Sequence, residues 1–233
     1  MTEPDPGSEA TGAALPPPLD AIEARILGAL VEKEATTPES YPLTANAVQL
    51  ACNQKNNRDP VMELEAGEVG HALRAMEQRG LLRSVHGSRA QRYEHRFSQA
   101  YSLTQKQQAL LSVLLLRGPQ TLAELLARCE RLQAFADTDE VRQALERLAQ
   151  RQLVVRIPRQ PGQREDRYLH QLCGPVDVAS IAAAASSSEP RGSRATSDAG
   201  LEERLRQLEA RVARLEAALG DLEPDDSPGE ADA

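Results

Sequence analysis

Aromatic residues are scarce in this chain, which has four Tyr, two Phe and no Trp among its 233 residues. With 40% hydrophobic residues overall, the composition predicts two small domains with modest cores. Cysteine is scarce as well. Cys52, Cys129 and Cys173 lie far apart and form no CxxC pair, which argues against a redox or metal site. We expect Cys52 and Cys129 to be small core residues.

Long apolar runs are missing too. No stretch approaches the eighteen or so consecutive apolar residues of a membrane span, and the N-terminus lacks the basic-then-apolar layout of a signal peptide. These absences predict a cytoplasmic protein that has no membrane partner.

The motifs of common catalytic and nucleotide-binding sites are also lacking. GxSxG, the P-loop, GxGxxG and HExxH do not occur, and the four histidines show no metal-ligand spacing. We therefore expect no enzyme activity, no catalytic residue, no cofactor and no bound metal. His95 and His170 are interpreted as hydrogen-bonded side chains packed under a hairpin. Residues 32–34, a Glu-Lys-Glu run, are interpreted as a solvated helix end.

The chain has no net positive charge, because its formal charge is −8. Residues 1–18 carry −3, and residues 176–233 carry six Arg against thirteen acidic residues, or −7, which leaves +2 for residues 19–175. Affinity for DNA of any sequence comes mainly from basic groups that neutralise phosphates. A nearly neutral central region weakens the case for such binding but leaves room for a local basic patch.

The most informative feature present is an internal repeat. EVGHALRAMEQRGL, from Glu68 to Leu81, recurs as EVRQALERLAQRQL, from Glu140 to Leu153, and RYEH at residues 92–95 recurs as RYLH at residues 167–170. A period of about 75 residues is a whole small domain rather than a solenoid unit. Each copy has the order helix, helix, helix, hairpin, which is typical of a winged helix.

Apolar periodicity and turn residues give the expected bounds of the elements. In the first copy the helices cover about 20–34, 44–53 and 65–79, and the strands 81–85 and 90–97. In the second copy the helices cover 104–117, 121–131 and 138–151, and the strands 153–158 and 164–172. The third helix of the first copy is expected to bury Val69, Ala72, Leu73 and Met76, with Gly80 closing it.

The expected fold class is therefore mainly α with small β-hairpin wings, built from two tandem winged-helix domains and a C-terminal coiled-coil helix. The expected boundaries are a disordered tail over 1–18, domains over 19–100 and 101–175, a linker over 176–198, a coiled-coil helix over 199–222 and an acidic disordered tail over 223–233.

The coiled-coil prediction rests on apolar residues spaced alternately four and three apart. In this register Arg204 faces a partner's Glu209, and Arg211 faces Glu216, which favours parallel pairing into a homodimer. A single amphipathic helix, folded back or frayed, is the alternative. The expected dimerisation residues are Leu201, Leu205, Leu208, Val212, Leu215, Leu219 and Leu222.

Both predicted wings are locally basic, whereas the exposed faces of the third helices also carry acidic groups that oppose phosphate. The wing arginines are either DNA contacts or ordinary solvated charges. The loop NQKNNRDP, residues 53–60, either reads a partner with its amides and cations or caps helix ends. The candidate contact residues are Arg83, Arg89, Arg92, Arg96, Arg156, Arg159, Arg164, Arg167, Lys55, Arg58, Arg74 and Arg142.

Three segments resemble a known family. VEKEATTPESYPLTANAVQLACNQKNNRDPV at residues 31–61, RYEHRF at residues 92–97 and LLLRGPQTLAEL at residues 114–125 are similar to the YceH-like family of bacterial proteins. The resemblance covers most of residues 19–175. It implies two tandem winged-helix domains in a cytoplasmic bacterial protein, and it carries over no catalytic residue.

We therefore expect a binding protein rather than an enzyme. The leading hypothesis is binding of double-stranded DNA in a regulatory role, inferred partly by analogy of fold. The alternative is a protein-interaction adaptor similar to the tandem winged-helix subunits of chromosome-condensation complexes. The basic wings favour DNA, and the acidic third helices favour the adaptor.

Overall fold

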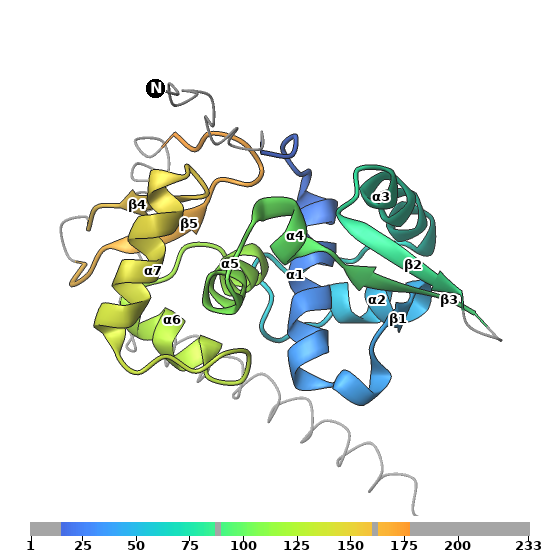
Figure 1. Cartoon of the computed structure of the whole chain (residues 1–233), viewed down its shortest axis with the longest axis horizontal. Coiled ribbons are helices and arrows are strands. Elements are labelled where there is room, and N and C mark those ends of the chain that lie inside the picture. The colour runs from blue at the N-terminus through green and yellow to red at the C-terminus, as the bar shows by residue number, and fades with distance from the viewer. Residues whose placement is uncertain (1–14, 87–89, 160–162, 178–233) are drawn as a thin grey trace, which may run out of the picture. The chain divides into compact units, whose positions relative to one another are not determined.

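The computed structural model describes residues 15–86, 90–159 and 163–177, all within one compact unit, residues 1–182 (Figure 1). This part is mainly helical and carries small antiparallel hairpins. None of its helices is long and apolar enough to cross a membrane. The predicted coiled coil and acidic tail, nearly all of the predicted linker, and residues 87–89, with Arg89, and 160–162 of the hairpin tips lie outside the described residues.

The two copies of the repeat have the same order of elements. The first comprises α1 (Ala21–Thr36), a 3-10 turn (Pro38–Ser40), β1 (Leu43–Thr44), α2 (Ala45–Cys52), α3 (Ala66–Gln78), β2 (Leu82–His86) and β3 (Gln91–His95). After α4 (Phe97–Tyr101), the second comprises α5 (Gln105–Arg117), α6 (Leu122–Cys129), α7 (Thr138–Gln150), β4 (Val154–Ile157) and β5 (Arg167–His170).

The sheets of the two copies also correspond. In the first copy β1 pairs with β3, with Leu43 opposite Tyr93, and β3 pairs with β2. In the second copy β4 pairs with β5, and a single antiparallel bridge from Gln120 to Tyr168 stands where β1 would be. Tyr93 and Tyr168 hold equivalent places in the repeat. The hairpins therefore share one plan, with a third strand reduced to one residue in the second copy.

Local sequence signals explain where the helices begin and end. The Asp20 side chain accepts a hydrogen bond from the Glu23 backbone N–H, and the Glu23 side chain accepts one from the Asp20 backbone N–H, which forms a capping box at the start of α1. Gly80 follows α3 with φ of +70°, a conformation in which a side chain would be strained. The predicted buried residues of α3 are confirmed, because Val69, Ala72, Leu73 and Met76 are all buried.

Three of the four predicted strands are too long, and α4 was not predicted. The strand expected to reach residue 97 ends at His95, and Phe97 begins α4 instead. Phe97 is fully buried, and Tyr101 packs against it edge to face, with ring centroids 5.3 Å apart. On a helix, residues four apart are neighbours on one face, whereas on a strand they share a face but lie about 13 Å apart, so only the helix lets the two rings pack together.

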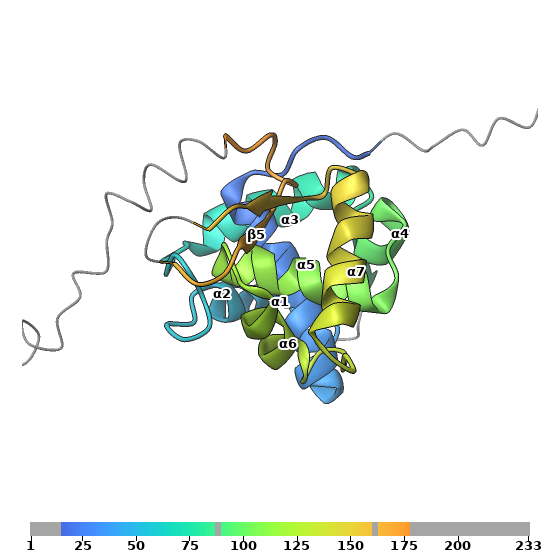
Figure 2. The ribbon, with the colours of Figure 1, turned by 90° about the vertical axis from the view of Figure 1, so that its left-hand side faces the viewer.

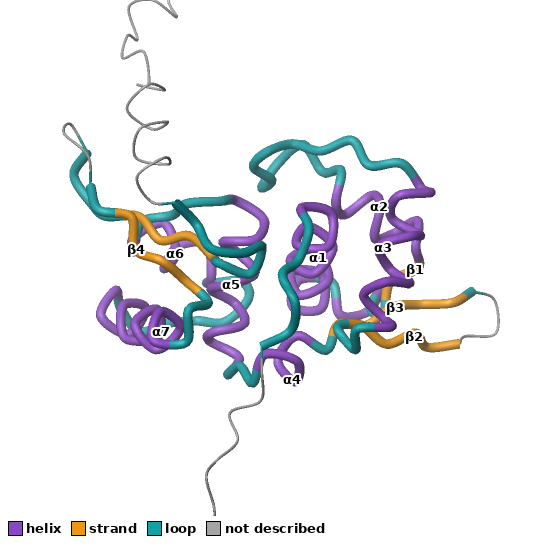
Figure 3. The backbone as a smooth tube through the Cα atoms, turned by 90° about the horizontal axis from the view of Figure 1, so that it is seen from above, coloured by secondary structure: helices purple, strands orange, loops and turns teal. Residues whose placement is uncertain are grey.

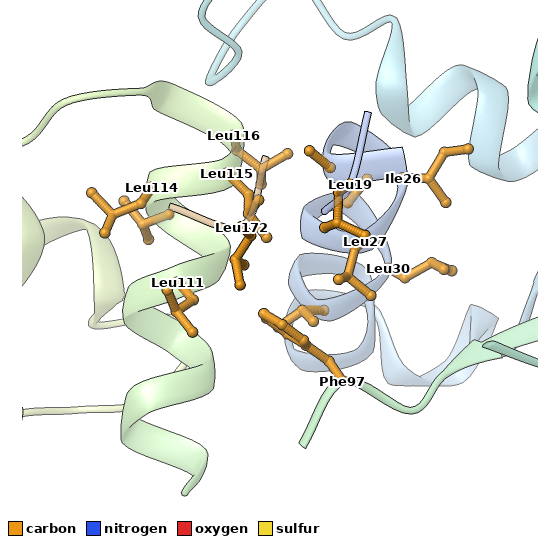
Figure 4. Close-up of a cluster of buried hydrophobic side chains, with 14 of the residues drawn as sticks. Leu19, Ile26, Leu27, Leu30, Phe97, Leu111, Leu114, Leu115, Leu116 and Leu172 are labelled. Atoms are coloured by element: carbon orange, nitrogen blue, oxygen red, sulfur yellow. The ribbon is translucent and has the colours of Figure 1, made fainter. Parts of the chain in front are cut away.

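The cores of the two copies form one continuous cluster along the contact between α1 and α5 (Figure 4). The two helices lie side by side in the centre of Figures 1 and 2. Ser112 on α5 donates a 3.0 Å hydrogen bond to the carbonyl oxygen of Gly28 on α1, and a Cβ at Gly28 would lie 2.9 Å from Leu116 Cγ. Because α1 has partners on both sides, every residue from Glu23 to Val31 is buried.

The cysteines Cys52 and Cys129 are confirmed as core residues. Both are fully buried, at the ends of α2 and α6. Burial raises the pKa of each thiol to about 12, so both remain protonated and unreactive at neutral pH.

Candidate nucleic-acid interface

The largest hollow described lies between α7 and the β4–β5 hairpin, with the start of α6 at one side. It encloses about 680 Å³. Leu145 and Tyr168 form part of its apolar floor, and Arg142, Arg156, Arg159 and Arg164 stand along its walls with Glu146, Glu165 and Asp166. The hollow therefore combines a helix face and a hairpin, and its rim has both signs of charge.

Two of the four arginines of this hollow form ion pairs within the chain, and two do not. Arg156 is paired with Asp166, with 2.7 Å between Nε and Oδ2, and Arg142 is paired with Asp139 at 2.6 Å. The carboxylate of Asp166 also accepts the Arg159 backbone N–H, and this bond, followed by Arg156, lowers the pKa of Asp166. The exposed side chains of Arg159 and Arg164 have no ion-pair or hydrogen-bond partner within the described ranges. Their charge is available to a ligand.

Two of the corresponding arginines of the first copy are held by the chain itself. Arg83 pairs with Glu94 at 2.7 Å, and Arg92 donates to the carbonyl oxygens of Ser40 and Pro42 at 3.3 and 2.7 Å. Exposed Arg74 and Arg96 have no side-chain partner in the described part of the chain. In each copy, therefore, some arginines are held by the chain and two exposed ones remain available to a ligand.

Arg167, although predicted in the same set, does not line the hollow. Its Nη1 donates to the Pro119 carbonyl oxygen at 3.0 Å and to Glu124 at 3.2 Å. Both partners lie on the face of β5 that is opposite to Tyr168. Successive residues of a strand point to opposite faces, so Arg167 and Tyr168 belong to different surfaces.

Arg58 is not a surface contact residue, which corrects the sequence-based expectation. Its side chain has 0% exposure, and its guanidinium donates to both carboxylate oxygens of Glu32, at 2.6 and 3.2 Å. It also donates to the Ala51 carbonyl oxygen at 2.8 and 3.1 Å, and to Asn57 and Gln54. With these donors engaged, Arg58 fastens the 53–60 loop onto α1 and the end of α2.

Most of the 53–60 loop is held in the same manner. The Asn53 side-chain amide exchanges two 2.9 Å hydrogen bonds with the backbone of Leu64, and buried Arg25 donates to the Cys52 and Pro60 carbonyl oxygens. The capping alternative is thus confirmed for Asn53 and Arg58. Lys55 and Asn56 remain exposed.

Comparison with known proteins gives the family. A family model described as "Protein of unknown function, DUF480" matches residues 19–163. A UPF0502 protein of Stenotrophomonas maltophilia (strain K279a) is 60% identical over 206 residues, 88% of this chain and 94% of the relative. A UPF0502 protein of Xanthomonas campestris pv. campestris (strain B100) is 53% identical over 207 residues, 89% and 93% of the two chains. The chain belongs to this uncharacterised bacterial family. The YceH-like family is the same one, so the resemblance read from the sequence is confirmed.

The predicted interpretation of His95 is also confirmed in this DUF480 chain. Its Nε2 lies 2.8 Å from Glu34 Oε2, and its Nδ1 accepts the Phe97 backbone N–H. The hydrogen bond with His95 is the main reason why the pKa of Glu34 is lowered. The interpretation of residues 32–34 as a solvated helix end is wrong for Glu32, which is largely covered and holds Arg58, whereas Glu34 is exposed as expected although it also pairs with His95.

His170 differs from its counterpart His95. Its Nδ1 is buried and has no hydrogen-bond partner in the described part of the chain. Burial lowers the pKa of His170 from its ordinary value of 6.5 to about 4. Across the same ranges, no group of three or more His, Cys, Asp and Glu side chains is arranged to hold a metal ion.

We expect His170 to make this DUF480 protein less stable as the pH falls. Because its pKa is lower in the folded state, the unfolded chain takes up a proton below pH 6.5 while the folded chain does so only near pH 4. The free energy of unfolding should fall across this window. Urea unfolding at several pH values should show a smaller fall in His170→Gln and an unchanged one in His71→Gln, which alters an exposed histidine. Equal falls in both variants would contradict this role.

Proposed function

We propose that this chain is a cytoplasmic, non-enzymatic tandem winged-helix protein that binds double-stranded DNA in a regulatory role, mainly through α7 and the β4–β5 hairpin. The observation that carries the proposal is the hollow between these elements, with unpaired Arg159 and Arg164 on its rim. In a winged helix the third helix and the hairpin are the parts that approach the duplex.

The order of elements supports the winged-helix assignment. α1, α2, α3 and the β2–β3 hairpin match α5, α6, α7 and the β4–β5 hairpin one for one, and the proposed domains, 19–100 and 101–175, follow this division. The fold alone does not establish DNA binding, because many functions share it. The choice of surface therefore rests on the charges.

The arrangement of the two copies argues for one DNA-binding hairpin. The β2–β3 and β4–β5 hairpins lie on opposite sides of the α1–α5 pair in Figures 1 and 3. The α1–α5 pair therefore separates the two hairpins. We place the DNA contact on the second copy because the hollow between α7 and the β4–β5 hairpin carries the unpaired Arg159 and Arg164.

The DNA proposal predicts unequal effects of paired substitutions. Arg159→Ala with Arg164→Ala should weaken binding to duplexes of any sequence, and should flatten the dependence of log affinity on log salt by about one unit per lost phosphate contact. Arg83→Ala with Arg92→Ala is the matched control and should have a smaller effect. Fluorescence anisotropy with a labelled duplex measures both quantities. Absence of binding by the folded wild type at low salt would sink the proposal.

A protein-interaction adaptor is the second candidate, and a specific observation favours it. The first turn of α7 carries Asp139 and Glu140, and the exposed residues that follow, Arg142, Glu146 and Arg147, nearly balance in charge. A helix face of this kind suits a mixed-charge protein surface better than a row of phosphates. If the folded wild type binds no duplex, the adaptor role becomes the better-supported function.

We also propose that the heptad segment, residues 199–222, makes the protein a weak parallel homodimer. These residues lie outside the described ranges, so the proposal rests on their spacing alone. Val212→Asp should dissociate the dimer, because it introduces a charge at a central a position on both strands. Sedimentation should show a dimer for wild type, and monomers for Val212→Asp and for a chain ending at Ser186. Equal masses in all three would exclude this segment as the dimerisation element.

A further inference from the structure

A second pocket lies where the two copies meet, on the other face of β5 from the hollow described above. It encloses about 260 Å³. Three arginines from three elements line it: Arg117 at the end of α5, Arg128 on α6 and Arg167 on β5. Residues 57–59 of the first copy complete its wall, and the Asp59 backbone N–H donates to the Leu116 carbonyl oxygen at 2.8 Å, which holds that wall in place.

The positive charge of this pocket is only partly neutralised by the chain. Glu124 is shared between Arg167 at 3.2 Å and Arg128 at 3.5 Å, and it also accepts the Thr121 backbone N–H. Arg58, the fourth arginine of the lining, is already neutralised by Glu32. Asp59 is the other acidic residue of the lining. The four arginines, taken together with the carboxylates of Glu32, Asp59 and Glu124, give the pocket one net positive charge.

Arg117 carries this surplus. Its half-buried guanidinium has no hydrogen-bond or ion-pair partner in the described part of the chain. Burial, followed by the nearby charge of Arg128, lowers the pKa of Arg117. The folded chain therefore holds a cation in a position that burial and a neighbouring cation both make unfavourable. An anion in the pocket would relieve this cost.

Gln120 forms a further part of the wall, 4% exposed. Its Nε2 donates to the carbonyl oxygens of Arg117 and Pro119, at 3.0 and 2.9 Å. These bonds hold the backbone that carries Arg117, and the ion pairs with Glu124 position the guanidiniums of Arg128 and Arg167. A site whose cations are positioned before a ligand arrives loses less entropy on binding.

We propose that this pocket binds the phosphate group of a small phosphorylated molecule. A guanidinium presents paired N–H donors that match phosphate oxygens, and three guanidiniums around one cavity suit a tetrahedral anion better than a planar carboxylate. A phosphate monoester is close to a dianion at neutral pH and can engage Arg117 as well as the two arginines that share Glu124. The volume admits a phosphate with a small organic body. The proposal is independent of DNA binding by α7.

Titration calorimetry with inorganic phosphate, in chloride buffers of constant ionic strength, tests the site. Wild type should give saturable heat, and Arg117→Gln should weaken phosphate binding by about tenfold or more. Arg147→Gln removes an exposed arginine of α7 and should keep binding within about twofold of wild type. Without phosphate, Arg117→Gln should melt no lower than wild type, because it removes an unpaired cation, so that a loss of binding is not a loss of folding.

Two results would overturn the proposal. One is an absence of saturable heat in folded wild type, and the other is equal phosphate affinity in wild type and Arg117→Gln. Titration with a DNA duplex shows whether the pocket binds a small phosphorylated molecule or the phosphates of DNA. Arg117→Gln should leave duplex affinity unchanged, and loss of duplex binding in this variant would reassign the pocket to the path of DNA.

Discussion

Replacing Arg58 with Ala is expected to lower the free energy of unfolding by about 3 to 5 kcal/mol. The substitution leaves the Glu32 carboxylate and the Ala51 carbonyl oxygen without their main donor in a site where the arginine side chain has no exposed surface. An unpaired buried charge costs more than the net value of the pair itself. The 53–60 loop should also lose its attachment to α1.

Urea unfolding followed by circular dichroism measures this effect. Lys55→Ala is the matched control, three residues away in the same loop and exposed, and should change the free energy of unfolding by less than about 0.5 kcal/mol. A change below about 1 kcal/mol in Arg58→Ala would show that the Glu32 pair does not hold the loop.

The second large effect is expected from Leu73→Ala on α3 and Leu145→Ala on α7. Both leucines are fully buried and occupy equivalent places in the repeat. Each truncation should cost about 2 to 5 kcal/mol, from lost burial and from the cavity left behind. Because one core runs through both copies across α1 and α5, each variant should lower a single unfolding transition of the whole unit.

Scanning calorimetry distinguishes a single unfolding transition from the two transitions that independently unfolding domains would give. Leu50→Ala, which removes a leucine that is 64% exposed, is the control and should leave the melting temperature nearly unchanged. Two separate transitions, with Leu73→Ala shifting only one of them and Leu145→Ala only the other, would mean that the α1–α5 contact does not couple the copies.

The features that could be predicted from the sequence are those that depend on residues close together in the chain. The caps at Asp20 and Gly80 and the buried face of α3 depend on residues within a few positions of one another, so periodicity and turn chemistry suffice. Helix α4 was missed because Phe97 continues the alternation of the preceding strand, and its packing against Tyr101 is a property of the folded chain. The continuous core was missed because hydrophobic spacing identifies an apolar face but not its partner.

The candidate site shows the same limit. The basic character of the wings is visible in the sequence, but the ion pairs that neutralise Arg83 and Arg156 depend on strand register. The role of Arg58 could not be predicted, since its partner Glu32 is 26 positions away and meets it only when the loop folds back over α1. The unpaired state of Arg117 is likewise a property of the folded chain, in which Arg128 and Arg167 share Glu124.

The most direct test of the proposed function is to map amide chemical-shift changes by NMR while a short duplex is added at low salt. Binding through the second copy predicts changes that concentrate on α7 and the β4–β5 hairpin, around Arg142, Arg159 and Arg164, with α3 and the β2–β3 hairpin little affected. Changes confined to the first copy, or none at duplex concentrations above that of the protein, would contradict it.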